Sequence, residues 1–183
     1  MPPTSPDRRS DEALVAALNG GDASAFDAIY FRYRDWVVRL AQRFTGNPED
    51  ALDVLQETFS YLFRKFPGFV LSARMTTFLY PVVKNLSIGA RRRRERHASK
   101  DEPHDPVAPE AVQHDQVRRE LSVVLGSLPE QQREVLLMRF VDDMSLLEIA
   151  AALGIPEGTV KSRLHNAVAA LRKDQRVRAY FEA

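Results

Sequence analysis

The chain has no cysteine, no long apolar run and almost no net charge. Without thiols it forms neither disulfides nor thiolate metal sites, which agrees with a reducing cytoplasm. No apolar stretch approaches the ~18 residues of a membrane span, and the first twenty residues mix charges of both signs, unlike a secretory signal. A formal net charge of +1 gives no overall sign of nucleic-acid binding, so such a signal must be local. We therefore expect a cytoplasmic protein with no membrane insertion.

Motifs of enzymes are also absent from the sequence. It has no Gly-rich phosphate loop, no His and Cys cluster at metal-ligand spacing and no nucleophile elbow. Three histidines, His97, His104 and His114, lie in or beside a proline-rich segment. We expect no enzymatic activity and no cofactor.

The proline-rich segment divides the chain. Residues 99–115 hold three prolines and several charges without any apolar period, a composition typical of a linker. Both sides show helical periodicity, and no alternating strand of convincing length is found. The sequence therefore predicts an all-α protein of two small helical domains. The expected parts are an N-terminal segment with a short helix (1–21), a first domain (22–96), a flexible linker (97–116) and a second domain (117–183).

The first domain is predicted to be a bundle of amphipathic helices. Ser10, Asp22 and Asn47 are expected helix caps, and Pro48 suits a first helical turn. A further helix is expected over residues 76–96, ending in a run of arginines. If Thr76 or Thr77 caps it, Pro81 falls in its first turns at little cost; deeper in the helix, Pro81 would kink it. In the third helix the apolar period predicts these inward residues: Ala51, Val54, Leu55, Thr58, Phe59, Leu62, Phe63 and Phe66.

The second domain contains a helix-turn-helix pattern. Two pairs have capping-box spacing, Ser127 with Glu130 and Ser145 with Glu148, and Gly154 is placed to end a helix in a left-handed conformation. The preceding helix should bury Leu136, Leu137 and Phe140. This is the architecture that lays a second helix into the DNA major groove.

That second helix is cationic on its outer face. If its apolar residues from Val160 to Leu171 face inward, four polar residues face outward: Lys161, Ser162, His165 and Asn166. Thr159 and Arg163 add a short donor and a second cation to this set. Lysine and arginine suit phosphates or guanine edges, and asparagine suits adenine. The alternative is a helical hairpin whose polar face is merely solvated.

Both modules resemble one family. The stretch "LPEQQREVLLMRFVDDMSLLEIAAALGIPEGTVKSRLHNAVAALRK" resembles the fourth domain of bacterial sigma factors of the extracytoplasmic-function (ECF) type, which binds the promoter −35 element. The stretches "EDALDVLQETF" and "TFLYPVVKNL" resemble helices of the family's second domain. Response regulators share the pattern "EIA…TVK", so a stand-alone DNA-binding regulator is the alternative function. The match of both modules, in the right order, favours the sigma factor.

The resemblance implies partners and sites. The family docks on an arginine-rich coiled coil of core RNA polymerase, which implies docking by Asp53, Gln56 and Glu57, three and four residues apart on one helix face. The outer-face residues of the cationic helix would bind the −35 element of promoter DNA. An anti-sigma factor is a further implied partner. For the −10 element, with its unpaired base, the implied residues are Phe69, Ser72, Ala73, Asn85, Arg91, Arg92 and Arg93.

The sequence departs from the family pattern around the −10 surface. Val70 and Leu71 stand in a loop that is usually polar with a glycine, and Phe78 stands at a usual tryptophan. Pro81 and Gly89 replace a common arginine and a common acidic residue. An apolar loop discriminates poorly among hydrogen-bonding patterns, so we expect loose base preference at the unpaired base of the −10 element. The alternative is that the backbone of Ser72 and Ala73, with Asn85, supplies the missing polar edges.

Overall fold

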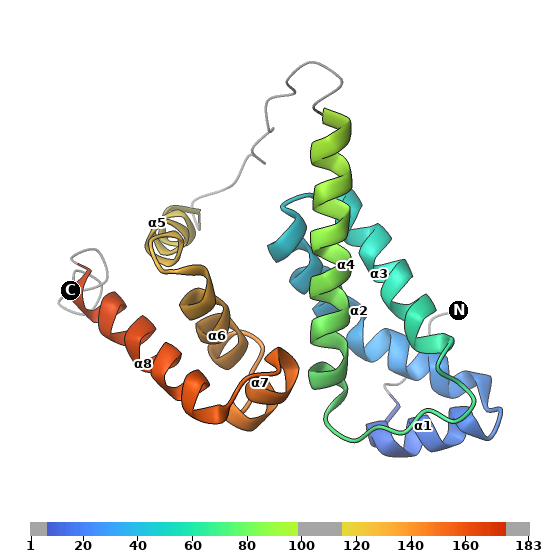
Figure 1. Ribbon diagram of the computed structural model, residues 1–183. Helices are drawn as coiled ribbons and strands as arrows, with labels where there is room; N and C mark the ends of the chain where they lie inside the picture. Colours follow the sequence, from blue (N-terminus) through green and yellow to red (C-terminus); the bar gives the residue numbers. More distant parts are fainter. Residues whose placement is uncertain (1–6, 99–114, 175–183) are drawn as a thin grey trace. The chain divides into compact units, whose positions relative to one another are not determined.

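A computed structural model describes residues 7–98 and 115–174. Every regular element in these ranges is an α-helix (Figure 1). The chain divides into two compact units on either side of the bond between His104 and Asp105. The all-α prediction is confirmed, and no helix among the described residues is long and apolar enough to cross a membrane.

The first unit contains helices α1 (Asp11–Asn19), α2 (Ala23–Thr45), α3 (Pro48–Phe63) and α4 (Met75–Ala98). The expected caps are confirmed. The Ser10 hydroxyl oxygen accepts from the amide of Ala13, the Asp22 carboxylate from that of Ser24, and the Asn47 side chain from that of Asp50. These bonds satisfy amide groups that a helix start otherwise leaves unpaired.

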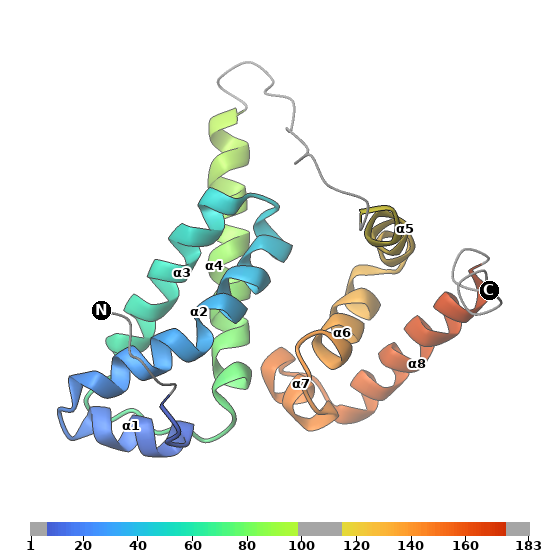
Figure 2. The ribbon, with the colours of Figure 1, turned by 180° about the vertical axis from the view of Figure 1, so that it is seen from behind.

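The core of this unit lies where α2, α3 and α4 pack against one another, and α1 packs on α2 (Figure 2). Its fully buried members come from all four helices: Leu14, Ile29, Val37, Leu40, Leu62, Leu79 and Tyr80. Burying one such side chain contributes roughly 1.5–3 kcal/mol. The three long amphipathic stripes predicted from the sequence therefore form one core.

Two sequence expectations about this unit are wrong. Phe63, expected inside, is 56% exposed, because it ends α3, and Phe66, expected on the same helix, lies beyond that end. Helix α4 begins at Met75, so neither Thr76 nor Thr77 caps it and Pro81 lies inside the helix. Pro81 has no N–H to donate to the carbonyl of Thr77.

The second unit contains α5 (Asp115–Gly126), α6 (Glu130–Phe140), α7 (Leu146–Leu153) and α8 (Glu157–Lys173). Ser145 and Glu148 form the expected capping box, and Gly154 ends α7 with φ of 64°. A residue with a Cβ is disfavoured at this φ. Helix α8 packs on α6 and α7, with Val160 and Ala167 fully buried, so the helix-turn-helix prediction is confirmed.

Two further expectations fail in the second unit. Ser127 does not form a capping box with Glu130: its hydroxyl donates to the carbonyl of Val124 (2.6 Å), and Pro129 is the N-cap of α6. Phe140, expected to be buried, is 67% exposed because it is the last residue of α6. The predicted flexible linker (97–116) falls mostly on residues 99–114, which lie outside the described part of the chain.

Candidate functional site

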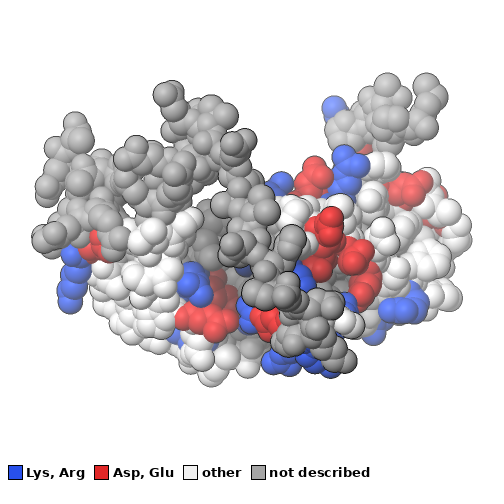
Figure 3. All heavy atoms as spheres, turned by 90° about the horizontal axis from the view of Figure 1, so that it is seen from above, with Lys and Arg blue, Asp and Glu red and all other residues white. Residues whose placement is uncertain are grey.

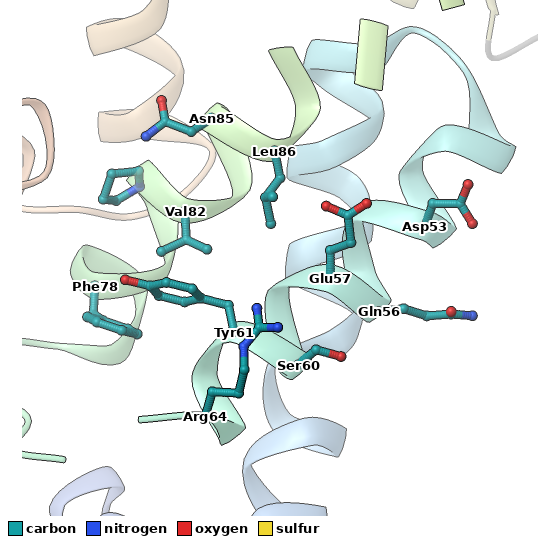
Figure 4. A pocket seen from close by; sticks show the side chains of 11 residues that line it. Asp53, Gln56, Glu57, Ser60, Tyr61, Arg64, Phe78, Val82, Asn85 and Leu86 are labelled. Atoms are coloured by element: carbon teal, nitrogen blue, oxygen red, sulfur yellow. The ribbon is translucent and has the colours of Figure 1, made fainter. Parts of the chain in front are cut away.

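A groove runs along the surface of the first unit, between the exposed sides of α3 and α4. Its volume is about 890 Å³. The α3 side contributes Asp53, Gln56, Glu57, Ser60, Tyr61 and Arg64, and the α4 side contributes Phe78, Pro81, Val82, Asn85 and Leu86. Figure 4 shows Tyr61, Val82 and Leu86 between the helices, whereas Asp53 and Gln56 point outward from α3. The groove thus has an apolar floor and a polar rim.

The three residues predicted to dock lie together on the exposed side of α3. Asp53, Gln56 and Glu57 are all exposed, as their three- and four-residue spacing requires. Glu57 differs from the other two because its carboxylate forms an ion pair with Arg93 of α4 (3.3 Å). Of the two carboxylates on this face, Glu57 is therefore ion-paired, whereas Asp53 has no ion-pair partner among the described residues.

The arginine run at the end of α4 is not uniformly available. Arg94 is held by the carboxylate of Asp50 and by the carbonyl of Thr45 (2.8 Å), so it ties α4 to α2 and α3. Arg91 pairs with Glu95 on its own helix (3.4 Å). Within the described residues Arg92 has no acidic partner. Acidic side chains lie interspersed with basic ones in the view of Figure 3.

The loop between α3 and α4 carries the other predicted −10 residues. Phe69 is half-buried and packs on Phe66 and Phe78, with ring centroids 5.4 and 4.8 Å away. Ser72 and Ala73 are exposed, and Val70 is 79% exposed. From Met75, where α4 begins, to Arg91 the helix rises roughly 24 Å. The predicted −10 residues thus form an extended surface, not a single pocket.

One contact to this loop was not predicted from the sequence. The side chain of Asn19, the last residue of α1, bonds to the backbone of Gly68 and Phe69. The expected N-terminal segment (1–21) is therefore packed onto the first unit. A lone asparagine before Gly-Gly carries no sequence signal for a partner fifty residues away.

Charged side chains fasten α1 to α2. Arg32 pairs with Asp11 (2.6 Å), Arg9 pairs with Asp22 (3.0 Å), and the hydroxyl of Tyr33 donates to Asp11. Hydrogen bonds from Arg9 hold the pKa of Asp7 at about 2. Because the pKa of Asp7 is lower in the folded chain than its ordinary value of 3.8, ionised Asp7 stabilises the folded state above pH 3.8. This stabilisation is lost as the pH falls toward 2.

The outer face of α8 has the residues predicted for it. Lys161, Ser162, His165 and Asn166 are exposed. Lys161 and Arg163 are two positions apart, so helical geometry puts them on opposite edges of this face. Arg163 is half-buried and has no ion pair among the described residues. Two cations thus flank a strip of small polar side chains.

Two local contacts on α8 were not anticipated. The ammonium group of Lys161 pairs with Glu157, one turn earlier (2.7 Å), and the hydroxyl of Ser162 donates to the carbonyl of Thr159 (3.0 Å). The spacing of Glu157 and Lys161 is the usual one for a helical ion pair, so the sequence did contain this signal. No group of side chains that could hold a metal ion is found among the described residues.

Comparisons with known proteins agree with this geometry. Residues 29–97 match the family described as Sigma-70 region 2, and residues 118–171 match the one described as Sigma-70, region 4. The chain is 32% identical over 177 residues to the ECF RNA polymerase sigma factor SigW of Bacillus subtilis, covering 88% of this chain and 95% of that one. It is 34% identical over 167 residues to the ECF RNA polymerase sigma factor SigM of Mycobacterium tuberculosis, covering 90% and 84%.

Two solved structures share the fold. CnrH in complex with the cytosolic domain of CnrY aligns with a TM-score of 0.64 at 21% identity, covering 94% of this chain and 97% of that one. The sigma factor RpoE in complex with the anti-sigma factor NepR from Bartonella quintana aligns with a TM-score of 0.64 at 21% identity, covering 84% and 100%. The sequence matches over both units show that this chain belongs to the ECF family of RNA polymerase sigma factors.

Proposed function

We propose that this sigma factor docks on core RNA polymerase through α3, contacts the promoter −10 element through the α3–α4 loop and α4, and contacts the −35 element through α8. The observation that carries the proposal is the opposite character of two exposed helix faces. The α3 face presents Asp53 and Glu57, whereas the α8 face presents Lys161 and Arg163. An acidic face suits a basic protein surface, and a cationic helix suits DNA phosphates.

The docking surface consists of Asp53, Gln56 and Glu57 in this proposal. Each is exposed and each borders the groove between α3 and α4. A carboxylate and an amide on one helix face can accept several hydrogen bonds from an arginine-rich coiled coil. Glu57 already accepts from Arg93 (3.3 Å), so Asp53 and Gln56 supply the remaining acceptors.

The −10 surface extends from the loop to the end of α4. The loop contributes Phe69, Ser72 and Ala73, and the rim of the groove contributes Asn85. Arg91, Arg92 and Arg93 would meet phosphates further along the helix. A distance of roughly 24 Å corresponds to about seven nucleotides at 3.4 Å each, so one end can hold an unpaired base while the other holds the duplex.

Phe69 has an indirect part in this surface. Its ring packs on Phe78, so it builds an apolar wall and does not extend into solvent. Val70, 79% exposed, presents a large apolar side chain on the loop. An apolar wall stacks a base but discriminates poorly among base edges, in keeping with the loose −10 preference expected from the sequence.

The −35 surface is the outer face of α8. Lys161 and Arg163 lie on its two edges and would contact phosphates on both sides of the major groove. Ser162, His165 and Asn166 lie between them and would meet base edges. Thr159 lies at the start of the helix, where free amide groups also favour a phosphate.

An anti-sigma factor is a further proposed partner. The two solved structures of similar fold both contain a bound protein, one of them called an anti-sigma factor. In the present chain both units expose large apolar side chains that such a protein could cover, among them Leu52 and Phe63 in the first unit and Phe140 and Leu147 in the second. The proposal also implies a cytoplasmic location and no catalytic step by the chain itself.

The alternative, a regulator that never contacts polymerase, is tested by co-elution with core RNA polymerase. The wild-type chain should co-elute. The double variant Asp53→Arg with Gln56→Ala should not, because a cation on a docking face repels an arginine-rich partner. Asp35→Arg reverses a charge at another exposed site of the same unit and should leave co-elution intact. Co-elution of the double variant at wild-type affinity would remove the docking assignment.

A further inference from the structure

Asn19 makes a two-sided contact with the loop that precedes α4. Its Nδ2 donates to the carbonyl of Phe69 (2.8 Å), and its Oδ1 accepts from the amides of Gly68 (2.7 Å) and Phe69 (3.2 Å). One side chain thus satisfies three backbone groups of two consecutive residues. Gly68 has φ of 99°, a conformation that glycine adopts without steric cost and that lets both amides point at one oxygen.

Asn19 is itself firmly placed. Leu14, Val15 and Leu18 of α1 are buried, and Arg32 pairs with Asp11 at the other end of the helix. The helix then ends in a tight turn in which the amide of Gly20 donates to the carbonyls of Ala16 and Ala17. The asparagine therefore stands on a rigid helix end, and its contact transmits the position of α1 to the loop.

The loop has few other fixed points. Between Val70 and Ala73 the backbone makes no hydrogen bond to other described residues. The chain is fixed again at Arg74, whose carbonyl accepts from the amide of Phe78 (3.2 Å), and at Met75, which is fully buried. Before this stretch, Phe69 is held on its ring side by Phe78 and on its backbone side by Asn19. Removing Asn19 leaves Phe69 held by its ring contacts with Phe66 and Phe78, while the backbone of Gly68 and Phe69 loses its bonds to the asparagine.

We propose that Asn19 is a positioning residue for −10 recognition, acting by fixing the backbone at Gly68 and Phe69 so that Ser72 and Ala73 face the DNA in one conformation. This rests on the proposed role of the loop in the −10 surface. Asn19 lies outside residues 29–97, the part that matches Sigma-70 region 2. Helix α1 thereby supports the −10 surface through the loop and does not itself contact DNA.

The test uses the full-length chain with core RNA polymerase and a promoter selected by the wild type from a randomised library. Asn19→Ala removes all three hydrogen bonds, whereas Asn19→Asp keeps an acceptor for the two amides. Asn47→Ala is the matched control, because it removes the bond from the amide of Asp50 (2.9 Å) in the same unit and does not touch the loop. Polymerase binding, open-complex formation and amide hydrogen exchange at Gly68 and Phe69 are measured for each variant.

The expected result separates the two alanine variants. Both should bind polymerase as the wild type does, but only Asn19→Ala should form open complexes about tenfold more slowly, the size expected when loop-fixing bonds are exchanged for water. It should also lose protection at Gly68 and Phe69. Asn19→Asp should be intermediate in both measurements.

Three outcomes would overturn the proposal, and they differ from one another. If the wild type opens promoters and Asn19→Ala opens them as fast as Asn47→Ala does, Asn19 has only a structural role. If the wild type binds polymerase yet opens no promoter in the library, the proposed function of the loop fails and the role of Asn19 fails with it. Unchanged exchange at Gly68 and Phe69 in Asn19→Ala would refute the contact itself, whatever the promoter does.

Discussion

The basic end of α4 and the outer face of α8 are both rich in cations, but the fold uses them differently. In α4, Arg93 pairs with Glu57 and Arg94 with Asp50, and both partners belong to another helix. In α8, Lys161 pairs only with Glu157 on its own helix, and Arg163 has no ion pair among the described residues. The arginine run of α4, although longer, thus forms more ion pairs with other helices of its unit than the cations of α8 do. The number of arginines in a helix therefore does not show how many of them are available to bind DNA.

The difference follows from what packs against each helix. Helix α4 lies against α2 and α3, and the first turn of α3 contains Glu49 and Asp50, acids that stabilise a helix N-terminus. Arginines near them find partners within the unit. Helix α8 buries its apolar side against α6 and α7, and the acid that pairs with its Lys161 is Glu157 of its own first turn.

The largest expected effect comes from removing both cations of α8. The double variant Lys161→Ala with Arg163→Ala should reduce the slope of log affinity against log salt concentration by about 2, because each phosphate contact releases about one counterion. When the salt concentration rises from 50 to 200 mM, the double variant should therefore lose roughly tenfold less affinity than the wild type loses. Titration of a −35 duplex at several salt concentrations measures it, and an unchanged slope would show that this face does not bind DNA.

A smaller effect is expected for Arg94, and it concerns stability. Arg94→Ala leaves Asp50 and the carbonyl of Thr45 without their partner, so the free energy of unfolding should fall by about 1–2 kcal/mol. Arg92→Ala, the control, should change it by less than about 0.5 kcal/mol. Urea unfolding followed by circular dichroism compares them. Equal stability of the two variants would contradict the structural role assigned to Arg94.

A gain of affinity is expected from Glu157. This carboxylate neutralises Lys161 and would lie near DNA phosphates, so Glu157→Gln should tighten binding of the −35 duplex a few-fold, in the range of an exposed ion pair. Asp143→Asn removes the same charge elsewhere in the second unit and should change affinity less. If both variants tighten binding equally, the effect is one of net charge and not of the pair.

The smallest effect is expected for Glu57 with Arg93. Both side chains are about half exposed, so a double-mutant cycle with Glu57→Gln and Arg93→Gln should give a coupling below about 1 kcal/mol in unfolding free energy. A larger coupling would place this pair with Arg94 among the contacts that hold α4 to α3.

The sequence predicted the helices well because their ends carry local signals. Ser10, Asp22, Asn47 and the Ser145–Glu148 pair each act within four residues, so their spacing is visible without the fold. At the start of α6 two cap signals competed, and the prediction was wrong. Pro129 is the N-cap of α6, and the hydroxyl of Ser127 donates to the carbonyl of Val124.

The predicted site residues of α3 and α8 lie on the faces that helix periodicity requires, but partners distant in the sequence could not be predicted. The contacts of Asn19 with Gly68 and of Arg94 with Thr45 join residues about fifty positions apart. Only tertiary packing brings such residues together, and neither carries a pattern of its own. The assignments of Asp53, Gln56 and Glu57 to docking, and of the α8 face to DNA, remain predictions.

Arg94 has a consequence for genetics. Under the proposed function, a screen that scores transcription would group it with Arg92 and Arg93, since losing any of the three would lower promoter output. The lower output of an Arg94 variant would have a different cause, because a less stable chain is degraded faster by proteases and its abundance falls. Immunoblots of cell extracts would therefore separate the two causes: Arg94 variants should be scarce, whereas Arg92 variants should accumulate normally and fail only at the promoter.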